Sequence, residues 1–572
     1  MSPDAAATPA GYRVFVTGPA TSAQRQTPEL RERLELTGER VTLRVIPQHP
    51  RVTPDPVAVK VKAPILAGPV GPDLAVFDYN RERDLVLAPA IPARDGSFPE
   101  YPLDDPRFHQ LNAYAIAARA IDLAESELGR LLGWGFEANR LIVLPHAGYL
   151  ANAFYDEDSH TLQFFSFRQP DGTIYHTSLV HDIVAHETGH ALLDAVRDRY
   201  TEGNHPHTAA VHEAIGDLAA VFAAFSHEVV RERFLAAAGT DLRGPNEVAS
   251  IAEDFEASST GSLALRDLAV ARPASFYRST TDPHVLSLQL SSAVWEALIR
   301  MYGVNRAGGD DPEPAFRLAR TALQRMVVRA LDYLPPADVT FGEFAVAMFR
   351  ADRFANQADT LGYRPAVAAV LAERGVIAGV EVVDAASAAD ADPPWPSRPR
   401  SWPRLTPAEA YVFLDANRRR LALHPQARYR DFVVRDVHVT SRPPRHELID
   451  EVILVYEYPV DVELDARRFG SLGGYWLPIW GGGTLVFDGE GRLRHHAEKP
   501  VTRGRIRDAL RFLERVAATS LVRMDPTAED RLRASAARAS YVAAIAGDRL
   551  ALRANPAVRC GARPALGDEA GR

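Results

Sequence analysis

Hydrophobic and polar residues alternate in short runs over the first hundred positions. The runs at 12–16, 41–46 and 57–62 place apolar side chains at every second residue, which is the period of a strand with one buried face. Prolines and glycines separate these runs, as they do between strands. Residues 1–100 are therefore predicted to form a β-rich N-terminal segment.

The apolar period then changes to that of helices. A helix is predicted over 104–132, closed by Gly133 and Gly135, and strands are predicted at 141–145 and 161–167. We expect one domain over residues 101–380, with a sheet lobe up to about residue 177 and a helical lobe after it. The helical lobe carries amphipathic stretches at 210–224, 286–302, 315–334 and 341–351.

A change of composition marks the end of this domain. Residues 384–404 are rich in proline, alanine and aspartate, so we interpret 381–404 as a linker. A C-terminal α+β domain is predicted over 405–555 and a disordered tail over 556–572. The glycine-rich aromatic run 473–483 favours a hairpin over an edge for a partner. The other elements predicted here are helices at 407–423, 504–522 and 528–547 and strands at 432–440, 451–462 and 483–487.

Composition excludes several classes of protein. The 572 residues carry 65 basic and 74 acidic side chains, and the net charge of −9 gives no reason to expect a nucleic-acid partner. The single cysteine, Cys560, excludes an intrachain disulfide framework. The chain shows no signal peptide and no apolar run long enough for a membrane span, so a cytoplasmic location is predicted.

The candidate chemistry begins at His186-Glu187-Thr188-Gly189-His190. Apolar residues recur at helical spacing on both sides of this run, which indicates a buried amphipathic helix. On a helix, residues four apart share a face, so His186 and His190 can bind one Zn²⁺ while Glu187 approaches a water on the metal. The alternative is a buried helix with two hydrogen-bonded core histidines.

A catalytic zinc site needs a third protein ligand. In one branch of HExxH enzymes this is a histidine six residues on, and Val196 excludes that branch. A second predicted helix instead presents Glu213 and, one turn away, Asp217. Glu213 can be the third ligand, and Asp217 can accept the other ring N–H of a ligating histidine. A solvated acidic face is the alternative, but apolar residues surround both acids.

With these residues the chain resembles the thermolysin-like zinc metallopeptidases, the gluzincins. The resemblance covers about residues 70–378. It implies an α+β fold with a thermolysin-like zincin catalytic domain, one Zn²⁺ per chain and a peptide or protein substrate. The matching positions are Asp182, His186, Glu187, His190, Ala191, Glu213, Ala214 and Asp217, the run Asn152-Ala153-Phe154-Tyr155, the pair Leu265-Arg266, and His284, Ser287 and Trp295.

The resemblance also implies roles for these residues. Asn152 and Ala153 lie on an edge strand that binds the peptide backbone. Ile183 and Leu265 line an apolar pocket, which implies an apolar residue after the scissile bond. Arg266 and His284 donate to substrate oxygens, with an ion pair to Asp267 and a helix cap as the respective alternatives.

Two departures from the family pattern stand out. The interval between His190 and Glu213 is longer than the resemblance implies, so the family's transition-state tyrosine has only a candidate in Tyr200, with His205 and His207 as rivals. Ala224 stands where calcium-binding members carry a carboxylate, which makes calcium doubtful.

The leading hypothesis is a zinc metalloendopeptidase with Glu187 as general base. An aminopeptidase is less expected, because the chain has no Gly-x-Met-Glu-Asn stretch. The competing hypothesis is a zinc-stabilised scaffold that has lost catalysis and recognises a partner through its C-terminal domain. Substrate identity, activation, oligomeric state and the role of the C-terminal domain are not determined by the sequence.

Overall fold

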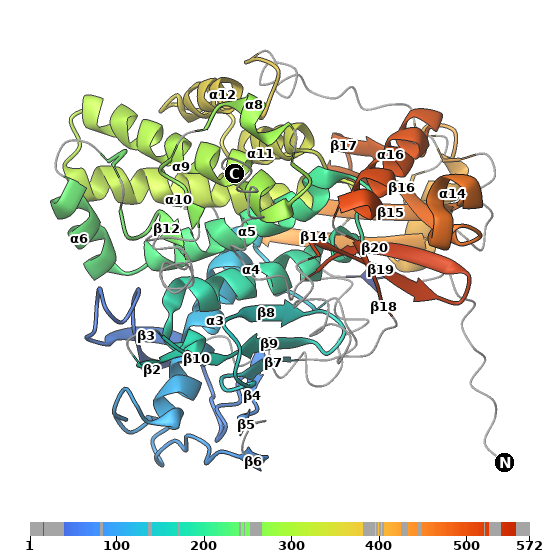
Figure 1. Ribbon diagram of the computed structural model, residues 1–572. Coiled ribbons are helices and arrows are strands. Elements are labelled where there is room, and N and C mark those ends of the chain that lie inside the picture. The colour runs from blue at the N-terminus through green and yellow to red at the C-terminus, as the bar shows by residue number, and fades with distance from the viewer. Residues whose placement is uncertain are drawn as a thin grey trace, which may run out of the picture.

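A four-stranded sheet and a long helix build the N-terminal lobe of the computed structural model (Figure 1). The strand order is β4 (Leu74–Val76), β7 (Leu141–Leu144), β9 (Thr161–Phe164) and β8 (Ala153–Asp156). Only β8 runs antiparallel to its neighbour, and it lies at the edge. The predicted sheet lobe is therefore present, and the run that begins at Asn152 lies on its edge strand. The structure describes residues 15–16, 39–80, 84–134, 140–169, 172–238, 242–244, 246–251, 266–270, 272–278, 280–380, 395, 398–399, 402, 405–421, 423–424, 433–442, 449–519, 521–524 and 539–555.

Helix α3 (Pro106–Leu128) is shorter than the helix predicted over 104–132. Asp105 caps its start by accepting a hydrogen bond from the Arg107 N–H, and Pro106 occupies the first turn. Gly129 ends the helix in the left-handed conformation (φ 71°), with its N–H donating to the Glu125 carbonyl. The helix thus ends one turn before Gly133, the glycine that the sequence pattern favoured.

The first hundred residues do not form one segment, contrary to prediction. The strands β2 (Arg40–Val45) and β3 (Val57–Lys62) are present as predicted, pair with each other and contact α3. The strand β1 (Phe15–Val16), however, pairs in parallel with β14 (Val433–Arg442) in the C-terminal domain. Open strand edges recruit partners from any part of a chain, so residue order alone did not reveal this pairing.

The helical lobe is confirmed, and three of its four predicted helices begin earlier than the apolar period indicated. Each of these three helices starts at a proline that directly follows the N-cap residue. Proline favours the first turn of a helix, but it does not belong to the apolar pattern from which the starts were predicted. The helices of this lobe are α4 (His181–Val196), α5 (Pro206–Ala224), α6 (Glu228–Ala238), α8 (Ala274–Tyr277), α9 (Pro283–Ala307), α10 (Pro312–Ala330), α11 (Phe341–Ala355) and α12 (Tyr363–Glu373).

Among the described residues, no single helix is long and apolar enough to cross a membrane. Only α5 and α6 together meet the length and composition criteria, and this pair is bent by 95°.

Short strands complete the two lobes. The remaining strands are β5 (Tyr79–Asn80), β6 (Leu85–Val86), β10 (Ser166–Arg168), β11 (Ile174–His176), β12 (Ser250–Ile251) and β13 (Arg266–Asp267).

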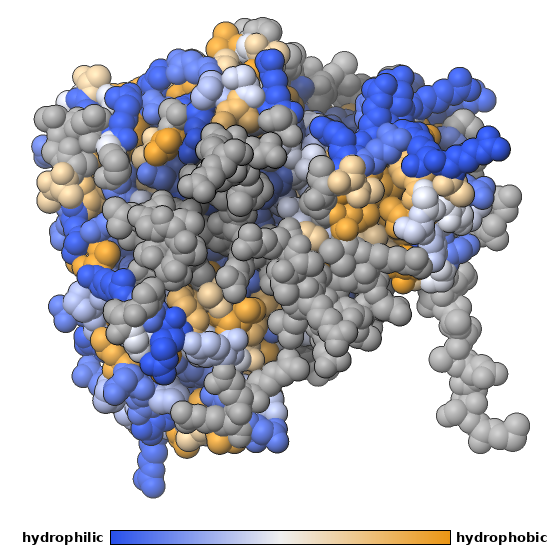
Figure 2. Space-filling model, in the orientation of Figure 1, coloured by the Kyte–Doolittle hydropathy of each residue, from blue (hydrophilic) through white to orange (hydrophobic). Residues whose placement is uncertain are grey.

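The C-terminal domain is built on one eight-stranded sheet, to the right in Figure 1. The strand order is β1-β14-β15-β16-β20-β19-β18, and β17 also pairs with β16. Figure 2 shows a hydrophilic ridge where α16 lies, beside an apolar area near β19 and β20. The elements are α14 (Pro407–Ala416), β15 (Ile449–Glu463), α15 (Ala466–Phe469), β16 (Trp476–Asp488), β17 (Leu493–Lys499), α16 (Arg503–Thr519), β18 (Leu521–Met524), β19 (Tyr541–Ala546) and β20 (Arg549–Ala554).

Two predictions for this domain are wrong. Where the helix was predicted over 528–547, the described residues contain a strand, β19, which pairs antiparallel with β20 and parallel with β18. Alanine favours a helix by itself, but strand pairing on both sides overrides that preference. The run 473–483 is not a hairpin of its own, because most of it belongs to β16. There, the Arg199 guanidinium lies 3.9 Å from the Trp480 ring, across the boundary with the helical lobe.

The predicted linker contributes to a core, contrary to expectation. Of its few described residues, Trp395 and Trp402 are buried against Phe413 and Phe487. Two large aromatic side chains outweigh the polar and proline-rich composition around them. The predicted tail, 556–572, lies outside the described residues.

A buried polar seam joins the C-terminal domain to the helical lobe. Glu451 on β15 forms an ion pair with Arg329 and accepts a hydrogen bond from the Tyr333 hydroxyl at 2.6 Å. The His495 Nε2–H donates to the Tyr333 carbonyl at 2.8 Å. Buried polar groups with fixed partners hold two surfaces in one register, so the C-terminal domain has a defined position beside the site described next.

Candidate metal centre and its cavity

Two glycines let α4 and α5 approach closely enough to share one site. A Cβ atom on Gly189 of α4 would lie 2.9 Å from the Gly216 Cα atom on α5. A Cβ atom on Gly216 would lie 2.6 Å from Cε1 of His186. Carbon atoms do not pack this closely, so the two helices can hold this spacing only with glycine at both positions. Neither glycine was assigned a role from the sequence.

His186, His190 and Glu213 lie together, as predicted from the sequence. The His186 and His190 rings are nearly perpendicular at 88°, with centroids 4.6 Å apart. Glu213 oxygens lie 3.6 Å from His186 Nε2 and 3.8 Å from His190 Nε2. Donor atoms around a tetrahedral zinc ion are about 3.3 Å apart, given metal–ligand distances near 2 Å. The three side chains therefore fit a divalent metal ion with little adjustment.

The outer nitrogens of both imidazole rings are engaged on the side away from Glu213. His186 Nδ1 lies 3.3 Å from Asp217, as expected, and His190 Nδ1 lies 2.8 Å from His212 Nδ1. Partners at Nδ1 orient each ring. His186 Nε2 also lies 3.2 Å from Arg266 Nη2, so this guanidinium has to move before a metal can bind there. His212 was missed from the sequence, although it directly precedes Glu213.

The charges of this cluster are strongly coupled. Burial and Arg266 lower the pKa of His186, but hydrogen bonds with Asp217 and Glu213 outweigh them and raise it to about 10. Burial raises the pKa of Glu213, but His284 and His190 bring it well below its usual range. The cluster therefore holds Glu213 as a carboxylate, the form that binds a metal, whereas His186 has to lose its proton before it can bind one.

Glu187 is positioned by the edge strand of the sheet. The Tyr155 N–H on β8 donates to Glu187 Oε2 at 2.9 Å. Burial raises the pKa of Glu187 to about 7. A carboxyl group whose pKa is near neutrality can both accept and return a proton at physiological pH.

Arg266 contacts the candidate ligands rather than open space. Its Nη1 lies 2.8 Å from Glu213 Oε2, and its Nε lies 3.2 Å from Asp217 Oδ1. Its Nη2 also lies 3.2 Å from His186 Nε2. These contacts differ from the expected hydrogen bond to a substrate oxygen, because buried carboxylates attract the guanidinium. In this arrangement Arg266 positions Glu213 and Asp217.

His284 borders the cavity, as expected. Asp282 caps α9 by accepting from the His284 N–H at 2.9 Å, and it also lies 3.1 Å from His284 Nδ1. His284 Nε2 lies 3.5 Å from Glu213 Oε1. The helix cap, which was the alternative reading of this position, belongs to Asp282 and orients the imidazole toward the site.

None of the three candidates for the transition-state donor presents a donor to the site. The Tyr200 side chain borders the cavity, but its hydroxyl donates to the Pro335 carbonyl at 2.7 Å. The expected role of Tyr200 as a transition-state donor is therefore wrong in this structure. His205 caps α5, and the His207 ring stacks on Phe341 at 4.1 Å. The segment between His190 and Glu213 instead contacts α11 and the loop that precedes it.

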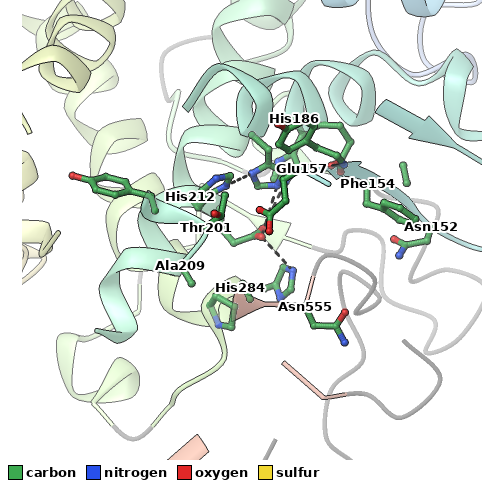
Figure 3. Close-up of a pocket in the computed structure, with 17 residues that line it drawn as sticks. Asn152, Phe154, Glu157, His186, Thr201, Ala209, His212, His284 and Asn555 are labelled. Carbon is green, nitrogen blue, oxygen red and sulfur yellow. Dashed lines mark hydrogen bonds and ion pairs between the residues drawn. The ribbon is translucent and has the colours of Figure 1, made fainter. Parts of the chain in front are cut away.

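A cavity of about 740 Å³, counted to its open mouth, surrounds these side chains (Figure 3). Asn152 and Ala153 line it, as expected for residues of the edge strand. Ile183 does not belong to its lining and is buried in the main hydrophobic core, because the face of α4 that carries it packs inward. Leu265 lies outside the described residues.

The C-terminal domain contributes to this cavity, which the sequence did not reveal. Ala554 and Asn555 line it, and Figure 3 shows Asn555 among the bordering residues. Arg553 forms ion pairs with Glu157, which lines the cavity, at 2.8 Å and with Glu202 at 3.0 Å, and so connects β20 to the N-terminal and helical lobes. The Tyr541 hydroxyl has no hydrogen-bond partner among the described residues. Burial raises its pKa, and Asp282 and Glu213 raise it further.

A scan against protein-family models gave no match, and a search of curated proteins found no similar sequence.

Proposed function

We propose that this protein is a zinc metalloendopeptidase whose residues 70–378 have a thermolysin-like zincin architecture. The observation that carries the proposal is the meeting of His186, His190 and Glu213 with Glu187 on the wall of one cavity. A buried structural metal site has no use for an acid beside its ligands or for an open side. Catalysis needs both.

The metal would be held by His186 Nε2, His190 Nε2 and the Glu213 carboxylate. Zinc bound there supplies a Lewis acid that polarises a carbonyl group and lowers the pKa of water. The ligand set of two imidazoles and one carboxylate is that of several zinc peptidases. One such ion per chain is proposed, and no role is proposed for calcium.

Glu187 would move the proton. The Tyr155 N–H holds Oε2, so Oε1 can accept a proton from the attacking water and deliver it to the leaving amine. His284 would donate to the oxygen on which charge develops, since Asp282 orients its ring.

The substrate would be an extended peptide. Within the described residues, β8 pairs with β9 on one side, and Asn152 and Ala153 at its start face the cavity. A peptide that adds to such an edge is bound by its backbone, whatever its side chains. The expected preference for an apolar residue after the scissile bond stays a prediction, because Ile183 packs in the core.

The test is metal-dependent cleavage by the purified full chain. A panel of unstructured fluorogenic peptides should be cut by the protein as isolated, not after removal of metal by a chelator, and again after addition of zinc. Cleavage that survives complete removal of metal would contradict the proposal. If no peptide is cut although zinc binds at His186 and His190, the scaffold hypothesis replaces it.

A further inference from the structure

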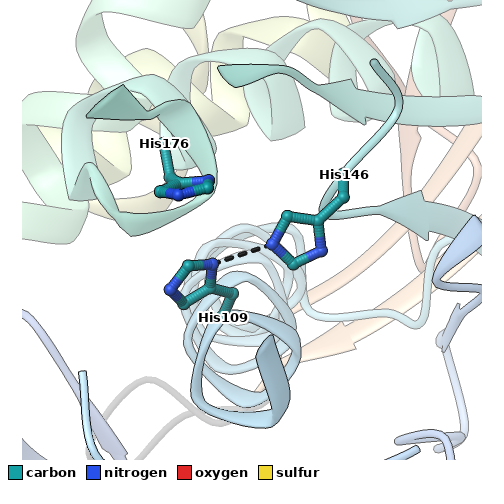
Figure 4. Close-up of side chains that lie close together, drawn as sticks. All are labelled: His109, His146 and His176. Atoms are coloured by element: carbon teal, nitrogen blue, oxygen red, sulfur yellow. Dashed lines mark hydrogen bonds between the residues drawn. The ribbon is translucent and has the colours of Figure 1, made fainter. Parts of the chain in front are cut away.

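A second cluster of histidines lies in the N-terminal lobe, away from the cavity. His109 comes from α3, His146 from the segment after β7, and His176 from the end of β11 (Figure 4). One nitrogen of each ring lies within 4.8 Å of one nitrogen of the other two. His109 and His146 are buried, and His176 is partly exposed. None of these histidines lines the cavity that holds Glu187.

Hydrogen bonds determine which nitrogen of two rings carries hydrogen. His109 Nε2 lies 2.9 Å from the Leu103 carbonyl oxygen, and His146 Nδ1 lies 2.8 Å from Asp78 Oδ1. A carbonyl oxygen and a carboxylate only accept hydrogen bonds, so both of these nitrogens donate. Gln110 holds the other oxygen of Asp78 at 2.8 Å, which keeps the carboxylate in place.

The remaining nitrogens of these two rings then face each other. His109 Nδ1 and His146 Nε2 lie 2.8 Å apart. In neutral rings both atoms carry lone pairs, and two lone pairs at this distance repel. A cation between or beside them removes the repulsion, and that cation is either an additional proton or a metal ion.

The third ring favours the metal ion. The His176 Nδ1 atom is buried and has no hydrogen-bond partner among the described residues. A shared proton would explain the contact between His109 and His146, but it leaves this nitrogen unsatisfied.

We propose that His109 Nδ1, His146 Nε2 and His176 Nδ1 bind one transition-metal ion, separate from the catalytic site. The donor set is three neutral imidazoles, which suits Zn²⁺, Co²⁺, Ni²⁺ or Cu²⁺ and excludes the oxygen-seeking Ca²⁺ and Mg²⁺. The carboxylate of Asp78 and the carbonyl of Leu103 orient the ligands, the usual arrangement behind histidine ligands. The ion would join α3, the end of β7 and β11, three parts of the lobe that are distant in sequence.

Metal stoichiometry of the full chain tests this inference independently of peptidase activity. With Co²⁺ as the probe, the wild-type protein is expected to bind two equivalents, and both H176A and the double variant H186A/H190A are expected to bind one. H160N is the matched control, because His160 has a positive φ of 58° that asparagine tolerates and belongs to neither cluster. It should bind two equivalents.

Each outcome decides between the two sites. If H176A binds as much Co²⁺ as the wild type, the inference is overturned and the His109–His146 pair shares a proton. If the wild type binds one equivalent and H176A binds none, the inference stands and the proposed function fails. Thermal unfolding with and without Co²⁺ gives a second readout: the added stability should be smaller in H176A and unchanged in H160N. Circular dichroism verifies that each variant is folded.

Discussion

The two histidine clusters of this protein contain similar ligands and differ in what surrounds them. The cluster of His186 and His190 has a carboxylate ligand, a neighbouring acid and a cavity open to solvent. The cluster of His109, His146 and His176 has imidazoles only, and hydrogen bonds to a carbonyl and a carboxylate behind them. Metal ligands by themselves therefore do not indicate catalysis. An acid that can move a proton, beside an open side of the site, does.

The largest effect on peptide cleavage is expected at Glu187, the acid that lies beside the cluster of His186 and His190 and has no counterpart in the other cluster's ligand set. The substitution Glu187→Gln keeps an oxygen to accept the Tyr155 N–H but removes the proton acceptor. We expect kcat/KM for peptide cleavage to fall about 10²–10⁴-fold, as for other general bases, with metal content unchanged. The exposed acid Glu373 supplies the control, and E373Q should retain full activity. If E187Q were as active as the wild type, Glu187 would not be the general base, and the acid would not distinguish this cluster from the other one.

The second prediction disturbs one cluster and spares the other. In Gly216→Ala the new Cβ atom would lie 2.6 Å from His186 Cε1, so we expect a loss of about 1–3 kcal/mol in the free energy of unfolding and weaker metal binding at the catalytic site. Gly303, in α9, has open space at the corresponding position. G303A should be more stable by about 0.5–1 kcal/mol. Urea unfolding and metal titration measure both, and equal behaviour of the two variants would contradict the close approach of α4 and α5.

The third prediction separates burial of a histidine from metal binding. Burial lowers the pKa of His495 to about 3, and this ring belongs to neither cluster. Because the folded state disfavours the proton, the contribution of His495 to stability is complete above its unfolded pKa of about 6.5 and decreases as the pH falls toward 3. The loss should approach about 1.4 kcal/mol per pH unit below 6.5.

Urea unfolding of the wild type and of H495Q between pH 7.5 and 5 checks this sign. H495Q should be less stable than the wild type at pH 7.5, because the hydrogen bond to the Tyr333 carbonyl is altered. Its stability should decrease less with falling pH. A parallel dependence in the two proteins would assign the acid sensitivity to other groups.

The smallest expected effect concerns access to the catalytic cluster. Arg553 connects β20 to Glu157, which lines the cavity, and to Glu202, and its side chain is partly exposed. Such ion pairs contribute roughly 1 kcal/mol or less, so R553A should remain folded and change KM by about fivefold or less. We expect KM to decrease, because without the ion pairs β20 can move away from the cavity. The decrease should be larger for long peptides than for short ones. R549A is the control, since the Arg549 ion pair with Asp461 lies on the same strand but does not involve the opening. An equal response of long and short peptides would show that β20 does not limit access.

Much of the proposed catalytic cluster could be predicted from the sequence, because its residues follow short helical spacings. His186 and His190 are four positions apart, as are Glu213 and Asp217, and any regular helix places such pairs on one face. Most predicted helices and strands are present for a related reason, since apolar periodicity shows which face is buried. The errors fall where long-range pairing prevails, as in the strand β19 and in β1, which pairs with β14.

The sequence by itself determined the local patterns: the helices, the edge strand and the residue types that can bind a metal. Only the tertiary structure decided which of these residues meet. It turned the Tyr200 hydroxyl toward Pro335, brought Arg266 onto Glu213, and placed Asn555 from the far end of the chain at the cavity. It also gathered His109, His146 and His176 from three separate elements. The physical reason is that periodicity records a neighbour one turn or two residues away, whereas contacts between elements depend on packing and strand pairing across the whole chain.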